Sequence, residues 1–228
     1  TAATILEGSW MAEIAVQVGP LVAGGSEAFL AAATDSALLA ELGLEARSAE
    51  GYLFPDTYRF APGIEARTLV REMLRNFCRK WDASEAAKAR DQPYSRHELV
   101  TLASIVEAEA GVTAERRRIA AVYRNRLDLG MPLQADPTVS YALGKRLART
   151  LYDDLEVQSP YNTYLVAGLP PGPIGNPGLA SIEAAANPLP ECRDLYFVAT
   201  GAGDHLFSPT YEGHLENRRR VRRNQASP

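Results

Sequence analysis

Seven of the 15 prolines in this chain of 228 residues lie between Pro160 and Pro190, and this cluster is its strongest constraint on the fold. Proline lacks an amide hydrogen and clashes with the preceding helical turn, so long helices are excluded from this segment. We expect a rigid, irregular wall of the kind that lines a groove. The segment is therefore a functional candidate by its architecture alone.

Ahead of the prolines, helices are predicted from apolar periodicity and from the residues that begin and end them. The first 48 residues are rich in Ala and Leu and predict a small helical lead-in with three short helices, at residues 9–18, 26–33 and 36–42. A longer helix is predicted over residues 65–90. Its apolar side chains Leu69, Met73, Phe77 and Trp81 recur every four residues and form one buried stripe.

The best-defined helix is predicted over residues 95–110. It begins with Ser95-Arg-His-Glu98, a capping box in which the Ser hydroxyl and the Glu carboxylate each accept from a backbone amide at the helix start. Leu99, Leu102 and Val106 share one apolar face, and Gly111 is placed to end the helix in a left-handed conformation.

Two further elements complete the fold prediction. Thr113 can cap a helix that runs to about residue 129, and residues 195–199 and 205–208 are typical of a β-hairpin before a terminal helix. We therefore predict an α+β fold that is mainly helical, with the helix over residues 95–110 at its centre and a small antiparallel β-sheet that includes the hairpin.

Composition excludes several classes of protein. The chain is 46% hydrophobic, and its 24 Lys and Arg against 28 Asp and Glu give a net charge of −4, which indicates a globular chain and argues against a nucleic-acid partner. No window approaches the ~18 uncharged apolar residues of a membrane span. Cys78 and Cys192 have no metal-ligand spacing, and no cofactor-binding motif is present, so neither a metal nor a cofactor is predicted.

Glu107 and Glu109 are the most informative carboxylates. At 100° per residue from Leu99 they lie roughly 200° apart, so they cannot both face one site. Glu109 falls between Leu102 and Ile105, and both this apolar setting and the nearby C-terminus of the helix dipole raise the pKa of its carboxyl. Glu109 is thus placed to act as a general acid. The alternative is that both Glu side chains are solvated or pair with the arginines at 116–118.

A glycosidase that uses two carboxylates would need a second one nearby, and Asp136 is the main candidate. The same residue, followed by Pro, is also a plain turn or helix-start signal. The segment Tyr161-Asn-Thr-Tyr164 combines amide and hydroxyl groups with aromatic rings, as sites for N-acetylated sugars do, although surface turns look alike.

Several motifs, in this order along the chain, resemble the endolytic murein transglycosylase family (MltG- or YceG-like). They are Glu50-Gly-Tyr-Leu-Phe-Pro-Asp-Thr-Tyr58, Leu99-Val-Thr-Leu-Ala-Ser-Ile-Val-Glu-Ala-Glu109, Arg124-Asn-Arg-Leu127, Leu133-Gln-Ala-Asp-Pro-Thr-Val139, Tyr161-Asn-Thr-Tyr164, Gly168-Leu-Pro-Pro-Gly172 and Leu195-Tyr-Phe-Val198. By this resemblance, residues 49–228 form the catalytic domain, and residues 1–48 follow a membrane anchor and a LysM-like segment that are absent from this sequence.

The resemblance implies cleavage of the bond between N-acetylmuramic acid and N-acetylglucosamine within nascent peptidoglycan strands, without water. One glutamate protonates the glycosidic oxygen and then accepts the proton of the muramoyl 6-hydroxyl, which leaves a 1,6-anhydro end and terminates strand elongation. In the family motif this glutamate matches Glu109. Ala110 follows it here, where many family members have Thr.

The resemblance also implies a groove lined by five further residues: Gln134, Asp136, Asn162, Thr163 and Tyr164. Asp136 or Asn162 is expected to hold an N-acetyl group, and residues 168–177 to form a wall. The implied partners are glycan strands and peptidoglycan synthases or divisome proteins, at the extracytoplasmic side of the bacterial inner membrane. Two alternatives stay open: a hydrolytic muramidase that uses Asp136, and a glycan-binding scaffold without catalysis.

Overall fold

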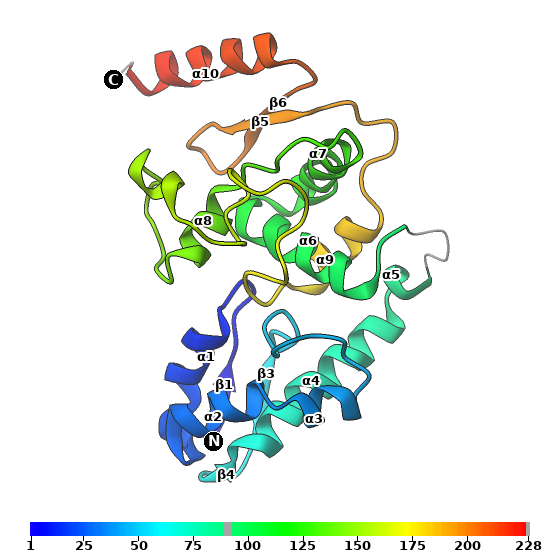
Figure 1. The fold of residues 1–228 in the computed structure, drawn as a ribbon, viewed down its shortest axis with the longest axis vertical. Helices are drawn as coiled ribbons and strands as arrows, with labels where there is room; N and C mark the ends of the chain where they lie inside the picture. Colours follow the sequence, from blue (N-terminus) through cyan, green and yellow to red (C-terminus); the bar gives the residue numbers. More distant parts are fainter. Residues whose placement is uncertain (89–92, 227–228) are drawn as a thin grey trace. The chain divides into compact units, whose positions relative to one another are not determined.

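A computed structural model describes residues 1–88 and 93–226 of the protein (Figure 1). The chain divides into two compact units. Unit 1 comprises Thr1–Ala108 and Gly172–Ala186, and unit 2 comprises Glu109–Pro171 and the chain from Asn187 onward. The proline-rich segment thus contributes to both units.

Unit 1 is built from helices that pack through apolar faces. They are α1 (Met11–Val18), α2 (Gly25–Ala33), α3 (Ser36–Glu41), α4 (Ala66–Ala83), α5 (Glu85–Lys88), α6 (Arg96–Glu109, with Glu109 itself in unit 2) and α9 (Leu179–Ala186). Two short strand pairs accompany them. Strand β1 (Ala2–Thr4) pairs antiparallel with β3 (Thr57–Arg59), and β2 (Val22–Ala23) pairs parallel with β4 (Ile64–Glu65).

Unit 2 contains α7 (Arg116–Asp128), α8 (Asp136–Ala142), α10 (Tyr211–Ala226) and the antiparallel hairpin of β5 (Tyr196–Ala199) and β6 (His205–Ser208). Helix α10 lies along the hairpin (Figure 1). Short 3-10 turns at Thr113–Glu115 and Asp153–Glu156 interrupt its long connections. The predicted hairpin and the prediction of a mainly helical α+β fold with small antiparallel strand pairs are both confirmed.

Local sequence signals account for the start of α6. The Glu98 carboxylate accepts from the Ser95 amide at 2.8 Å, and the Ser95 hydroxyl accepts from the Glu98 amide at 3.3 Å, which is the predicted capping box. The helix is buried all round from Leu99 to Val106, not on one face only. Its central position therefore comes from packing on every side.

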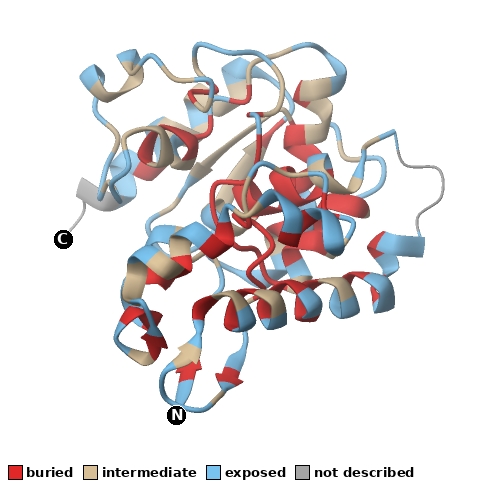
Figure 2. Ribbon diagram, turned by 60° about the horizontal axis from the view of Figure 1, so that its bottom comes forward, coloured by how far each residue is buried: buried red, intermediate tan, exposed pale blue. Residues whose placement is uncertain are grey.

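The helix predicted over residues 65–90 is broken at Ser84. Its buried stripe recurs along α4 as expected (Figure 2), but Ser84 adopts an extended conformation with ψ of 160°. The Ser84 hydroxyl donates to the Trp81 carbonyl at 2.6 Å and accepts from the Ala87 amide at 3.3 Å, so this residue ends α4 and caps α5. Residues 89 and 90 of the prediction lie outside the described residues.

The proline-rich segment behaves as its composition requires. Every residue from 160 to 190 is described, and the longest helix there is α9, with eight residues. The boundary predicted at residue 48 does not coincide with the packing units, because residues 1–48 share unit 1 with α4 and most of α6. The assignment of residues 49–228 as the catalytic domain stays a prediction, since packing alone does not test it.

Candidate functional site

Glu109 is the last residue of α6, and its side chain is half-buried. The chain leaves the helix through Gly111, which does not take the left-handed conformation that we predicted. A glycine is needed there for another reason: a Cβ on Gly111 would lie 2.1 Å from the carbonyl oxygen of Gly203. The turn after Glu109 is therefore pressed against the loop of the β5–β6 hairpin, within unit 2.

Tyr123 of α7 supplies the hydrogen bond to Glu109. Its hydroxyl donates to Glu109 Oε1 at 2.8 Å, and its ring is almost fully buried. Two of the arginines that were alternative partners have other partners: Arg117 donates to the carbonyl of Asn187, and Arg118 pairs with Asp194 at 2.7 Å.

Burial raises the pKa of Glu109 to about 7, because the surrounding protein disfavours the charged carboxylate. The Tyr123 hydrogen bond and the positive charge of Arg126 act in the opposite direction, while the negative charge of Asp136 raises the pKa further. Glu109 thus holds and releases a proton near neutral pH, which is what a group acting first as acid and then as base requires.

Asp136 and Tyr164 form a second polar pair in the same unit. The Tyr164 hydroxyl donates to Asp136 Oδ1 at 2.5 Å, and Asp136 is exposed at the start of α8. Burial is the main cause that raises the pKa of Tyr164 above its ordinary value, so this hydroxyl keeps its proton and remains a donor. The structure therefore brings Glu109, Asp136 and Tyr164 within electrostatic reach of one another.

Gln134 is also exposed, and its φ of 51° is unusual for a residue other than glycine. The backbone amide of Gln134 donates to the Thr163 carbonyl at 3.0 Å. This hydrogen bond ties the loop before α8 to the loop that contains residues 161–164. A conformation of this kind persists only where the surrounding contacts enforce it.

Asn162 and Thr163 are fully buried, unlike the other predicted groove residues. The side-chain amide of Asn162 donates to the backbone carbonyls of Leu155 and Val157 at 2.8 and 2.9 Å. The Thr163 hydroxyl accepts from the Ala135 amide at 3.0 Å. Both side chains are therefore engaged in holding the loops that carry Tyr164 and Asp136.

Arg126 and Tyr123 were not predicted as site residues. Arg126 is buried and donates to the carbonyls of Leu195 and Leu133 at 2.7 Å each, so one guanidinium joins the loop before α8 to the start of the hairpin. Its position within the motif Arg124-Asn-Arg-Leu127 was the sequence signal that could have identified Arg126 as a site residue. Nothing local in the sequence indicates that Tyr123 reaches Glu109.

Glu107 has a separate environment in unit 1, where its carboxylate accepts from the Gly178 amide at 2.9 Å. The two glutamates thus bond to different partners, in agreement with the angle that the helix places between them. Within residues 1–88 and 93–226, no group of three or more His, Cys, Asp or Glu side chains could hold a metal ion. Cys78 and Cys192 are free thiols.

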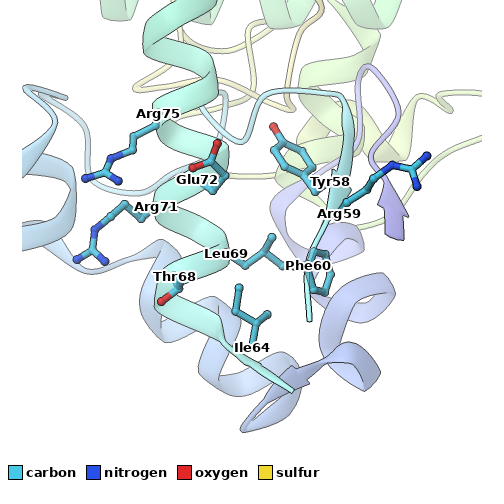
Figure 3. Close-up of a pocket in the computed structure, with 9 residues that line it drawn as sticks. All are labelled: Tyr58, Arg59, Phe60, Ile64, Thr68, Leu69, Arg71, Glu72 and Arg75. Carbon is cyan, nitrogen blue, oxygen red and sulfur yellow. The ribbon is translucent and has the colours of Figure 1, made fainter. Parts of the chain in front are cut away.

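A cavity of about 380 Å³ lies in unit 1, lined by β3, β4 and α4 (Figure 3). Phe60, Ile64 and Leu69 form its apolar centre, and the acidic residue in its lining, Glu72, pairs with Arg79 at 3.2 Å. None of the candidate site residues described above lines it. In the described part of the chain, no helix is long and apolar enough to cross a membrane.

A half-buried carboxyl with a pKa near 7, flanked by an exposed carboxylate and by tyrosine hydroxyls, is typical of a general acid–base site. Comparison with known proteins agrees with this class. A model of the YceG-like family matches residues 1–220, and the chain belongs to this family.

Two curated relatives carry the name endolytic murein transglycosylase. The relative from Bacillus subtilis is 44% identical over 166 residues, which cover 72% of this chain and 46% of that protein. The relative from Streptococcus pneumoniae is 34% identical over 240 residues, which cover 94% of this chain and 43% of that protein. The chain thus spans less than half the length of these relatives.

A solved structure has the same fold. The crystal structure of a YceG-like protein from Listeria monocytogenes superposes with a TM-score of 0.83 at 36% sequence identity, and the match covers 95% of this chain and 75% of that one.

Proposed function

We propose that this chain carries the catalytic domain of an endolytic murein transglycosylase, with Glu109 as its acid and base. The observation that carries the proposal is the half-buried Glu109 carboxyl, whose pKa of about 7 suits both roles. The names of the relatives support the substrate class, and the family match supports the assignment of the domain.

In the proposed reaction, protonated Glu109 gives its proton to the oxygen that joins N-acetylmuramic acid C1 to N-acetylglucosamine. The C1–O bond breaks, and the N-acetylglucosamine end leaves with that proton. The carboxylate then accepts the proton of the muramoyl 6-hydroxyl while O6 bonds to C1. Glu109 ends protonated, no water is consumed, and a 1,6-anhydro end remains.

The other site residues have two kinds of role in this proposal. Asp136, Tyr164 and Gln134 are proposed to contact the sugars, because Asp136 and Gln134 are exposed and the Tyr164 hydroxyl bonds to Asp136. The Asp136 carboxylate would also stabilise the positive charge that develops at C1. Asn162 and Thr163 are proposed as positioning residues, because their polar groups bond to the surrounding loops.

The exposure of Asp136 near Glu109 favours one second candidate, a muramidase in which Asp136 directs a water or acts as the nucleophile. The two reactions differ in their products, since hydrolysis leaves a reducing muramic acid end.

We also propose the setting of the whole protein from its family. It would act on nascent glycan strands at the extracytoplasmic side of the bacterial inner membrane, held there by a membrane anchor. Cleavage would terminate strand elongation, and peptidoglycan synthases or divisome proteins would be its partners.

Mass spectrometry of un-crosslinked glycan strands tests the reaction. Strands digested by the parent chain should carry 1,6-anhydro ends, and Glu109→Gln should lose roughly 10²-fold or more of this activity. Glu107→Gln is the matched control, since an amide oxygen can still accept from the Gly178 amide, and it should retain activity. Reducing ends would move the assignment to hydrolysis and to Asp136. Strand binding without cleavage by the parent would favour the scaffold alternative.

A further inference from the structure

The β5–β6 hairpin contacts the surroundings of Glu109 through a row of aromatic rings. The Phe197 ring meets the Tyr123 ring edge to face, with centroids 5.7 Å apart at 85°. The His205 ring in turn meets Phe197 at 5.2 Å and 88°. Since the Tyr123 hydroxyl bonds to Glu109, the row leads from His205 in the hairpin to the proposed acid.

The same histidine is tied to the segment that follows Glu109. Glu115, in the 3-10 turn before α7, accepts from the backbone amide of His205 at 3.1 Å, and its other oxygen lies 2.8 Å from His205 Nδ1. Only 6% of the His205 side chain and 17% of the Glu115 side chain are exposed. The contact of Gly203 with Gly111 adds a second link between the hairpin and this segment.

Hairpin and acid are therefore connected on two sides. One connection passes through Phe197 and Tyr123 to the Glu109 carboxyl. The other passes through Glu115 and Gly111 to the backbone that follows Glu109. Packed rings together with hydrogen bonds of this kind restrict the side chains to one arrangement.

We propose that His205 and Glu115 are positioning residues that keep the Tyr123 hydroxyl on the Glu109 carboxyl. The role rests on the proposed function, because it assigns these two residues to the acid of that reaction. Neither touches the reacting atoms. Their effect reaches Glu109 through the placement of Tyr123, while the charged groups that face Glu109, Asp136 and Arg126, stay unchanged.

Variants of His205 distinguish the effect of its hydrogen bond to Glu115 from the effect of the space that its side chain fills. Asparagine places an amide nitrogen close to the position of Nδ1 and should keep the bond, whereas glutamine places its amide nearer the position of Nε2 and should not. All three variants remove the imidazole ring, and alanine also removes every side-chain donor. His97→Ala is the matched control, since His97 also bonds through Nδ1, to the Tyr52 hydroxyl at 2.7 Å in unit 1.

The readout is the pH titration of the Glu109 carboxyl carbon by ¹³C NMR, with the signal assigned by its loss in Glu109→Gln. Because the Tyr123 hydrogen bond lowers the pKa of Glu109, Tyr123→Phe should raise that pKa by roughly half a unit or more. His205→Ala and His205→Gln should shift it in the same direction. The double variant of His205→Ala with Tyr123→Phe should shift the pKa little beyond Tyr123→Phe alone. His97→Ala should match the parent, and His205→Asn should lie closer to the parent than His205→Gln does.

A titration of His205→Ala that coincides with the parent would overturn the positioning role, and so would an equal shift in His97→Ala. If His205→Ala does not fold, the comparison of Asn with Gln decides the matter. The titration needs no turnover, so a parent that makes no anhydro ends contradicts the proposed reaction and leaves this test intact. If turnover is seen, the alkaline limb of its pH profile should move with the NMR titration.

Discussion

The helical core of unit 1 and the loop region of unit 2 are stabilised by different interactions. Unit 1 packs large apolar side chains between helices, with Phe29, Leu38, Met73 and Phe77 all fully buried. Unit 2 buries polar side chains that bond to loop carbonyls and amides, among them Arg126, Asn162 and Thr163. The irregular stretch that enters unit 1 follows the second pattern, since buried Asn176 accepts from the Leu53 amide at 2.9 Å.

The difference follows from the backbone. A helix satisfies its own amides and carbonyls, so its neighbours need only fill space, whereas buried loops require side chains to satisfy theirs. Polar side chains that bond at fixed points also fix the loops themselves. A reactive carboxyl such as Glu109 therefore has the rigid setting that acid–base chemistry needs, although the nearby Tyr164 lies in a loop.

The largest expected effect contrasts Arg126→Met with Phe77→Ala. Both should cost about 2–5 kcal/mol of unfolding free energy, the first by leaving buried carbonyls without a donor and the second by opening a cavity. Only Arg126→Met should also raise the pKa of Glu109, because the Arg126 charge lowers it. Urea unfolding and the NMR titration of Glu109 measure the two quantities. An equal pKa change in Phe77→Ala would erase the contrast between the regions.

A smaller effect is expected from a matched pair of buried threonines. Thr163→Val leaves the Ala135 amide without its acceptor and should cost about 1–3 kcal/mol. Thr101→Val, within α6, removes only a bond to the His97 carbonyl, which the helix itself can satisfy, and should cost less than about 1 kcal/mol. Urea unfolding compares the two, and equal losses would mean that loop and helix depend on such bonds alike.

The third predicted effect depends on pH and is a gain in stability from Glu109→Gln at high pH. The pKa of Glu109 rises from an ordinary 4.5 to about 7 on folding, so between these values the folded state holds more protons than the unfolded state. The parent therefore loses stability as pH rises from 4.5 to 7, and the Gln variant does not. This rise in pKa corresponds to about 3 kcal/mol at pH 8, so the Tm of the variant should then exceed that of the parent by roughly 6–12 °C, and the difference should vanish near pH 4. A Tm difference of the same size at pH 8 and at pH 4 would contradict the burial of the Glu109 carboxyl as its cause.

Sequence patterns predicted the elements whose signals are local. The capping box at Ser95 set the start of α6 within one residue, and the three short helices of the lead-in also form where caps and periodicity placed them. The break at Ser84 escaped detection, because residues that favour a helix, such as Ala86 and Ala87, follow it and only the hydroxyl geometry reveals it. Asn162 and Thr163 were expected to line the groove, and only the tertiary structure reveals that they are buried in the loops.

What the sequence determined by itself was the helix that carries Glu109, the apolar residues on either side of it, and the angle that separates it from Glu107. These follow from a helical period and caps that act over a few residues. The pKa of Glu109 was decided by the tertiary structure, because Tyr123, Arg126 and Asp136 lie 14 to 27 residues away along the chain and reach it only after folding. Desolvation and electrostatic interaction depend on distances in space, which a linear pattern does not contain.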